Sequence, residues 1–266
     1  MKLGFVCLLL MVFIGCGASP KSVQQGATVP TPTPTPTPTP PPPSPAQNQT
    51  VFSNINNNGS GWGSCSATSC AGGTSVASSY WMAQFQNTPS RDGSSAEFYV
   101  SGTQPYSDVL FWNMLGANDS LTQFTWDFWV YLDQASVGAG ALEYDMFQFA
   151  NGVEYMFGSQ CSYDTGYWDV WNQNTGHWIP TSLPCQQFSP DTWHHIVWQY
   201  HRTSDQNMHF DSLTLDGVEH DLNMTEPSGP LPSGWNENIG VQWQLDTSSA
   251  ALAFHEWVDN VTLTAQ

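Results

Sequence analysis

Basic residues are scarce in this 266-residue chain, which contains only four Lys and Arg against 22 Asp and Glu. Its formal net charge is −18 at pH 7. Binding to nucleic acid needs a basic surface that releases counterions from the phosphates. The composition therefore excludes a nucleic-acid partner, and it disfavours an anionic polysaccharide for the same reason.

Long apolar runs are also rare, and the one that stands out is the segment from Leu3 to Ile14. It follows Lys2 and is too short to span a bilayer, so residues 1–16 are predicted to be an export signal. Its end, Phe13-Ile-Gly-Cys16, resembles a bacterial lipoprotein lipobox except for Phe13 in place of the usual Leu. That resemblance implies a lipid on Cys16. We expect an exported protein that is anchored to the bacterial cell envelope through Cys16, with secretion as the alternative, and no other membrane contact.

Carboxylates are absent from residues 17–47, where Thr-Pro repeats run into Pro-rich sequence between Pro30 and Pro45. Such a segment cannot form a core and favours polyproline conformation, so its 16 Pro-rich residues would extend about 50 Å. We predict a stalk over 17–47. Residues 48–266 show no second shift in composition and are long enough for a single domain.

Helical periodicity is missing from 48–266, which instead contains short segments of alternating apolar and polar residues separated by Gly, Pro, Asn and Asp. This pattern predicts an all-β fold, an antiparallel β-sandwich or barrel. Residues 51–80 read as loop and short edge strands. The predicted strands are 96–101, 109–114, 124–132, 141–150, 153–160, 167–172, 193–200, 208–215, 239–245 and 254–264.

The domain contains four cysteines, an even number that predicts two disulfides in an exported protein. Of three possible connectivities, we favour Cys65 with Cys70 and Cys161 with Cys185, because each pair is nearest in sequence. Their spacing suits zinc poorly, and the sequence predicts no metal-ligand set. A structural calcium ion held by Asp and Asn residues of the turns stays open.

The strand over 141–150 holds two acids inside an aromatic sequence, Ala-Leu-Glu-Tyr-Asp-Met-Phe-Gln-Phe-Ala. Period-two alternation places Glu143 and Asp145 on one face and Tyr144 and Met146 on the other. If the second face packs into the core, the acidic pair lies on the open face. A solvated or structural acidic pair is the alternative to a functional one.

Three patterns together resemble the concanavalin A-like lectin and glucanase superfamily. They are Glu143-Tyr-Asp-Met-Phe-Gln148, the pair Asp191-Thr-Trp-His-His-Ile-Val-Trp-Gln-Tyr200 and Leu213-Thr-Leu-Asp-Gly217, and Glu256-Trp-Val-Asp-Asn-Val-Thr-Leu263. The first is similar to the Glu-x-Asp-x-x-Glu signature of family-sixteen glycoside hydrolases, and the others to strands of laminin-G-like domains. The resemblance implies a jelly-roll sandwich and a carbohydrate ligand.

For catalysis, the resemblance implies that Glu143 is the nucleophile and that Asp145 assists it. Gln148 occupies the position of the general acid, and an amide cannot protonate a leaving oxygen. Gln148 also reaches that face of the strand only if a β-bulge intervenes. A substitute acid would have to come from another strand, and His177, His195, Asp169 and Glu154 are the candidates.

For binding, the segment from Tyr167 to Trp178 mixes aromatic rings with amides and a histidine, as carbohydrate sites do. Trp171 and Trp178 are the expected stacking platform, with ordinary core packing as the alternative. His177 and Gln148 are expected to contribute polar contacts.

On the strand over 193–200, the more apolar set of alternating residues is expected to face the core. That set includes His194, which we expect to be a buried histidine with satisfied hydrogen bonds. His195 and Gln199 on the other face are expected to line a groove.

The sequence thus predicts a jelly-roll domain that binds a neutral polysaccharide, such as a β-glucan or xylan, through a groove on one face. An endo-acting glycoside hydrolase using Glu143 and Asp145 is the alternative function. A surface protein without a glycan ligand is the third.

Overall fold

The computed structural model describes residues 49–66 and 75–266. The predicted export signal, the lipidation at Cys16 and the stalk over 17–47 lie outside the described residues. So does Cys70, and its predicted bond to Cys65 stays a prediction. Among the described residues, no helix has the length and apolarity needed to cross a membrane.

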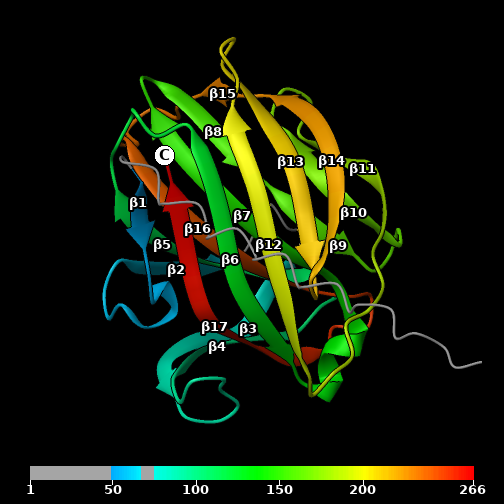
Figure 1. Ribbon diagram of the computed structural model, residues 1–266. Helices are drawn as coiled ribbons and strands as arrows, with labels where there is room; N and C mark the ends of the chain where they lie inside the picture. The colour runs from blue at the N-terminus through cyan, green and yellow to red at the C-terminus, as the bar shows by residue number, and fades with distance from the viewer. Residues whose placement is uncertain (1–48, 67–74) are drawn as a thin grey trace, which may run out of the picture. The chain divides into compact units, whose positions relative to one another are not determined.

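The described residues form two β-sheets that pack face to face (Figure 1). In sheet A the spatial order is β3, β4, β17, β6, β12, β13, β14, and β1 pairs with the end of β17. These strands are β1 (Thr50–Phe52), β3 (Ser75–Gln86), β4 (Ser95–Gly102), β6 (Gln123–Leu132), β12 (Trp193–Arg202), β13 (Asn207–Leu215), β14 (Val218–Pro227) and β17 (Ala253–Ala265).

In sheet B the order is β2, β5, β16, β7, then β8 and β9 one after the other along the same edge of β7, then β10 and β11. The short β15 pairs with β8. These strands are β2 (Trp62–Ser66), β5 (Ser107–Gly116), β7 (Ala139–Ala150), β8 (Val153–Phe157), β9 (Ser159–Ser162), β10 (Tyr167–Asn172), β11 (His177–Pro184), β15 (Gly229–Pro230) and β16 (Asn238–Thr247).

Two short 3₁₀ helices, η1 (Ile55–Asn57) and η2 (Gln134–Gly138), complete the secondary structure of the described residues. The two sheets packed face to face confirm the predicted antiparallel β-sandwich of the jelly-roll type.

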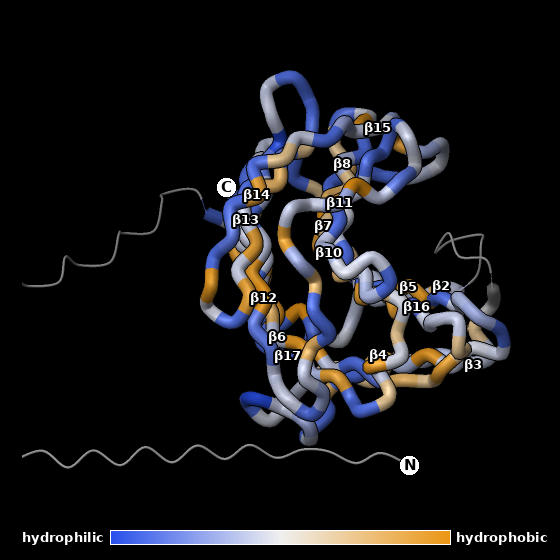
Figure 2. The backbone as a smooth tube through the Cα atoms, turned by 90° about the vertical axis from the view of Figure 1, so that its right-hand side faces the viewer, coloured by the Kyte–Doolittle hydropathy of each residue, from blue (hydrophilic) through white to orange (hydrophobic). Residues whose placement is uncertain are grey.

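The core lies between the two layers seen edge-on in Figure 2. Trp243 of β16 is at its centre, with its ring 5.1 Å from Trp126 of β6 and 5.6 Å from Phe98 of β4. Each of these side chains is fully buried. Burying a large apolar side chain contributes about 1.5–3 kcal/mol, so this aromatic layer supplies much of the stabilisation that joins the two sheets.

Most predicted strands match, and the differences have local causes. Residues 153–160 form two strands because the chain breaks at Gly158. A Cβ there would lie 2.8 Å from the Cβ of Trp171, so only glycine permits this approach.

The strands β11 and β14 were not predicted. Both lie at sheet edges, where Pro180 in β11 needs no ladder hydrogen bond and the charged residues of β14 protect an exposed edge. β3 is also longer than the short edge strands predicted for 51–80. It starts beside β5 in sheet B and continues beside β4 in sheet A.

The predicted disulfide between Cys161 and Cys185 is confirmed, with a Cα–Cα distance of 5.3 Å. It joins β9 to the segment after β11. The hairpin formed by β10 and β11 lies within the loop that this bond closes.

Candidate functional site

The acidic pair lies on the open face of sheet B. Glu143 and Asp145 of β7 point away from the core, while Tyr144 and Met146 between and after them are fully buried inside it. Alternation along β7 produces this arrangement, as the sequence predicts. The pair lines a groove of about 780 Å³, which we call the sheet-B groove.

The sheet-B groove combines aromatic, amide and acidic side chains from seven strands and their loops. Its aromatic residues are Tyr106, Trp171, Trp178 and Trp235, and its amides are Gln160, Gln173, Gln242 and Gln244. Its acids are Asp108, Glu143, Asp145, Glu154, Asp164 and Asp246. None of the described residues that line it is Lys, Arg or His.

Acids and amides alternate across the floor of the groove. The strand register places Gln244 of β16 opposite Glu143 of β7, and Glu143 opposite Gln160 of β9, which is opposite Asp169 of β10. Gln244 Nε2 donates to Glu143 Oε2 at 2.8 Å, and Gln160 Nε2 donates to Asp169 Oδ2 at 2.9 Å. Each amide thus satisfies a buried carboxyl without bringing in a positive charge.

Asp145 is held in the same way. The backbone N–H of Ser159 donates to its Oδ1 at 2.9 Å, and Gln242 Nε2 donates to its Oδ2. These bonds fix the carboxyl group on the floor of the groove. They also favour its ionised form.

The pair shares a proton. Burial, followed by the charges of Asp145 and Asp246, raises the pKa of Glu143 well above its ordinary value. Burial also raises the pKa of Asp145, to about 6, although hydrogen bonds from Glu143 and Gln242 oppose the shift. The pKa of Glu143 is the more strongly raised, so in the hydrogen bond between the two side chains the proton lies on Glu143 and the charge on Asp145, which is the opposite of the state that a nucleophilic carboxylate needs.

A second carboxyl pair lies at the end of the groove, where Asp246 of β16 is opposite Asp108 of β5. Burial raises the pKa of Asp108 to about 7, and burial together with the charge of Asp108 raises the pKa of Asp246. One buried oxygen of each side chain has no hydrogen-bond partner among the described residues. Both of these oxygens are shielded from solvent, so they add to the cost of ionising the pair.

Gln148 does not belong to the groove. The side chain is fully buried on the core side of β7, where its Nε2 donates to the carbonyl oxygens of Asn118 and Leu121. The pairing of β7 with β16 and β8 is regular from Asp145 to Gln148, so the bulge that would turn Gln148 outward is absent. The prediction that Gln148 contributes a polar contact to the binding site is therefore corrected, because its side chain lies in the core.

With a regular strand, Phe147 is the next residue of β7 on the face of Glu143 and Asp145. Its ring is almost fully buried and stacks on Phe149 at 4.8 Å. Neither position that could continue the acidic signature along β7 thus holds a carboxyl group. Among the predicted substitute acids, Glu154 lines the groove, and Asp169 is bound to Gln160 beside it.

The predicted platform residues form one wall of the groove. Trp171 of β10 and Trp178 of β11 are half-buried, and their rings meet edge to face at 5.1 Å. Trp171 Nε1 donates to Gln173 Oε1 at 2.7 Å, and Gln173 Nε2 donates to Glu154 Oε2 at 2.8 Å. This chain of hydrogen bonds orients the wall, so Trp171 is held in one position.

The other predicted binding residues lie elsewhere. His177 is exposed at the start of β11 and does not line the groove. His195 lies in sheet A, where its ring stacks on Trp129 at 4.4 Å and its Nε2 lies 2.8 Å from Asp127 Oδ1. Gln199, also in sheet A, donates to Glu219 at 3.3 Å. Glu143 and the residues predicted on β12 are thus in different sheets.

His194 has both ring nitrogens in hydrogen bonds, with Asp216 Oδ2 at 2.9 Å and the Ser189 carbonyl at 3.1 Å. Its side chain is 12% exposed. This matches the expected satisfied histidine.

Sequence reasoning missed the contributions of Trp235, Tyr106 and the β16 residues. The β16 residues carry a readable signal, because Gln242, Gln244 and Asp246 alternate with buried apolar residues. Trp235 lies in a loop, where no periodicity reveals which way a side chain points.

The chain is similar to known proteins in its fold and not in its sequence. No family model matches the sequence, and no curated protein matches it. One similar solved structure is a cellulose induced protein, Cip1, with a TM-score of 0.45 and 13% identity over 71% of this chain and 87% of that one.

Two others are an endo-1,3-beta-glucanase from Streptomyces sioyaensis (TM-score 0.40, 11% identity, 84% of this chain and 99% of that one) and a family 11 carbohydrate-binding module from Clostridium thermocellum (TM-score 0.33, 12% identity, 80% and 94%). At such values, none of these structures defines a ligand for this chain.

Proposed function

We propose that this protein binds a neutral polysaccharide in the sheet-B groove. The observation that carries this proposal is the combination, in one open groove, of four aromatic side chains with amides and carboxyls held in fixed positions. Aromatic faces pack against the C–H faces of sugars. Oriented amides and carboxyls donate hydrogen bonds to hydroxyl groups and accept hydrogen bonds from them.

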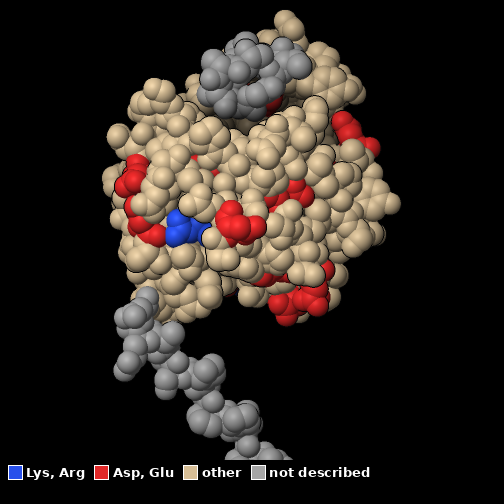
Figure 3. Space-filling view, turned by 90° about the horizontal axis from the view of Figure 1, so that it is seen from above, with Lys and Arg blue, Asp and Glu red and all other residues tan. Residues whose placement is uncertain are grey.

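The charge distribution argues for a neutral ligand. Acidic patches are spread over the face in Figure 3, which shows a single basic patch. The two basic residues of the described chain are engaged outside the groove. Arg91 lies 3.3 Å over the ring of Trp129, and Arg202 donates to the Asp119 carbonyl at 2.7 Å. A glycan with carboxylate or sulfate groups would meet acidic walls and no cation.

Binding, rather than cleavage, is the function that we propose. Both positions that could supply the acid along β7 hold other residues, Phe147 and Gln148, and burial together with neighbouring charges raises the pKa of Glu143 well above its ordinary value. A glycoside hydrolase needs a carboxylic acid and a carboxylate flanking the scissile bond at a defined separation. The alternative of an endo-acting hydrolase is not favoured by this arrangement.

Affinity electrophoresis tests the proposal. The protein is run through gels that contain a β-glucan, a xylan or an anionic polysaccharide, beside the variants Trp178→Ala and Trp81→Ala. Trp81 is exposed on β3 and does not line the groove, so it is the matched control. Retardation by a neutral glycan that Trp178→Ala weakens and Trp81→Ala preserves would support the proposal. No retardation by any neutral glycan, or equal loss in both variants, would contradict it.

We also propose that the protein acts outside the cytoplasm, anchored through Cys16 or secreted. The support is the apolar segment Leu3 to Ile14 and the lipobox-like residues that follow it. Fractionation of cells that express the full chain and a Cys16→Ser variant tests this. Anchoring predicts that the wild-type chain sediments with membranes and that the variant does not.

A further inference from the structure

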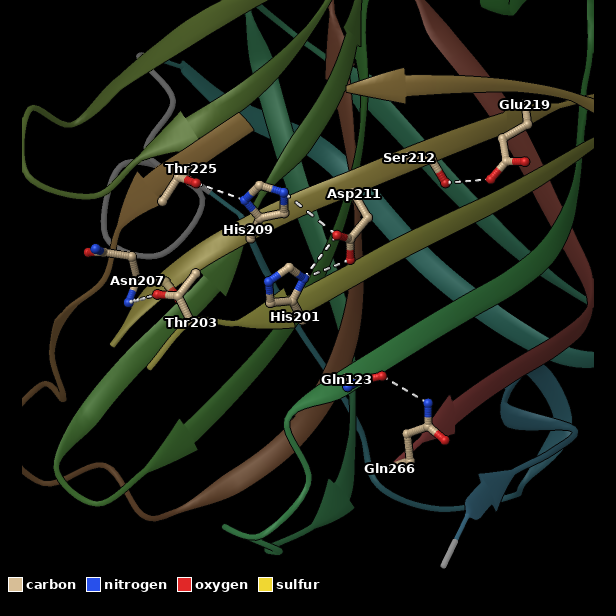
Figure 4. Close-up of polar contacts among 10 residues, drawn as sticks. All are labelled: Gln123, His201, Thr203, Asn207, His209, Asp211, Ser212, Glu219, Thr225 and Gln266. Atoms are coloured by element: carbon tan, nitrogen blue, oxygen red, sulfur yellow. Dashed lines mark hydrogen bonds and ion pairs between the residues drawn. The ribbon is translucent and has the colours of Figure 1, made fainter. Parts of the chain in front are cut away.

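Two histidines and an aspartate meet on the outer face of sheet A, far in sequence from the groove residues of β7 (Figure 4). His201 comes from β12, and His209 and Asp211 come from β13. One ligand atom from each lies within 4.8 Å of the others. Ile196, Trp198 and other alternate residues of β12 fill the core, so the cluster faces solvent.

The contacts of Asp211 are directed at both rings. His201 Nδ1 lies 2.9 Å from Asp211 Oδ1 and 3.0 Å from Oδ2, while His209 Nε2 lies 3.6 Å from Oδ1. The register of β13 shifts between Phe210 and Ser212, so Asp211 is the extra residue of a bulge. Bulges re-aim side chains and are frequent beside functional sites.

The second ring nitrogen of His209 is already committed. Its Nδ1 lies 2.7 Å from Thr225 Oγ1 of the neighbouring β14. When Nδ1–H donates to that hydroxyl, Nε2 presents a lone pair toward Asp211. The 3.6 Å distance between Nε2 and Oδ1 is too long for a hydrogen bond, so this lone pair and the carboxylate face each other without a shared proton.

We propose that His201, His209 and Asp211 bind a divalent transition-metal ion of the zinc class. His209 Nε2 and Asp211 Oδ1 are 3.6 Å apart. An ion about 2.1 Å from both atoms would have an N–metal–O angle of about 120°, close to the tetrahedral value. The hydrogen bond to Thr225 fixes the orientation of the His209 ring, as hydrogen bonds to the second ring nitrogen do in metal-bound histidines. Two imidazoles and one carboxylate suit zinc, nickel or copper rather than calcium, which takes six to eight oxygens.

The site is open, since the side chains of His201, His209 and Asp211 are 36%, 16% and 38% exposed. Solvent completes the coordination in a site with three protein ligands. A bound ion would replace the hydrogen bond between His201 Nδ1 and Asp211. The sequence alone did not reveal this set because its members come from two strands.

The experiment is calorimetric titration of Zn²⁺ into the untagged full chain, first freed of metal with a chelator. The variants are His209→Gln and Asp211→Asn, with Thr225→Val to test the orienting bond. His195→Gln is the matched control, because His195 also lies beside an aspartate in sheet A but has no second imidazole there. Circular dichroism checks that each variant is folded.

We expect one Zn²⁺ per chain for the wild type and the control, at least a 100-fold loss of affinity in His209→Gln and Asp211→Asn, and about a 10-fold loss in Thr225→Val. Absence of saturable binding, or equal affinity in wild type and His209→Gln, would overturn the proposal and leave an ordinary histidine–aspartate ion pair. Zn²⁺ binding is expected to be unchanged in Trp235→Ala, so this result is independent of glycan binding.

Discussion

Gln244 Nε2 donates a 2.8 Å hydrogen bond to Glu143 Oε2 across the ladder between β16 and β7. The Glu143 carboxyl group also forms a hydrogen bond with Asp145, in which Glu143 is the donor because its pKa is the more strongly raised. Glu143 thus acts as one acceptor and one donor. A glutamine side chain offers the same two functions at any pH.

We therefore expect Glu143→Gln to fold normally and to keep its affinity for glycan. A catalytic nucleophile would instead be lost in this variant, together with any release of reducing ends. Measuring glycan affinity and reducing ends for both proteins separates the two functions. Reducing ends that the wild type releases and Glu143→Gln does not would favour the hydrolase.

Stability is expected to decrease as pH rises. The fold raises the pKa of Glu143 above its ordinary value of 4.5 and that of Asp145 from 3.8 to about 6. Because these pKa values are raised, the stabilisation is fully present below about pH 4 and is lost as pH rises through the folded values. The thermal midpoint should fall between pH 5 and pH 8.

In Glu143→Gln that pH dependence should become shallower, by on the order of 1–3 kcal/mol of unfolding free energy across the same interval. Glu219→Gln is the control, since Glu219 is exposed on β14 outside the groove. Thermal unfolding at several pH values measures both variants. Identical slopes in wild type and Glu143→Gln would show that burial of Glu143 does not set its protonation.

Gln148→Glu is expected to destabilise the domain and to create no hydrolase. The amide of Gln148 donates to two carbonyl oxygens in a fully buried position. A carboxylate there would lose both bonds and face two acceptors, at a cost of about 2–4 kcal/mol. Chemical denaturation measures this loss. A stable Gln148→Glu variant that cleaves a glycan would mean that residue 148 faces the groove.

Removing the Cys161–Cys185 disulfide should weaken both stability and binding. A closed loop of this length, with a sequence separation of 24, contributes about 3 kcal/mol. The loop contains the hairpin with Trp171 and Trp178. Comparing Cys161→Ser/Cys185→Ser with the wild type by denaturation and glycan titration tests this. Full glycan affinity in a destabilised variant would show that the hairpin needs no such constraint.

Much of this fold could be predicted from residue patterns, and the reason is alternation. The strand over 141–150 could be assigned its two faces because Tyr144 and Met146 need the core and Glu143 and Asp145 do not. The edge strand β11 could not be predicted in the same way, since its prolines and half-exposed residues show no clean period.

The site was harder to predict than the fold. Alternation states that His195 and Gln199 share a face, but not which sheet contains them, and they lie in sheet A. The family resemblance that placed Gln148 at the position of the general acid assumes a β-bulge. Whether a bulge forms depends on the hydrogen-bond register of the strands and not on residue type. Trp235 joins the groove through a loop, where neither rule applies.

Aromatic side chains of the sheet-B groove are proposed to bind glycan, and titration of tryptophan variants tests this. Isothermal titration with the neutral glycan selected by electrophoresis is carried out on wild type, Trp235→Ala and Trp81→Ala. The two tryptophans are comparably exposed, at 52% and 41%, but only Trp235 lines the groove. Loss of one stacking contact of about 0.5–1.5 kcal/mol should weaken binding about 2- to 12-fold in Trp235→Ala and leave Trp81→Ala unchanged. Unchanged affinity in Trp235→Ala, or a larger loss in Trp81→Ala, would contradict the account.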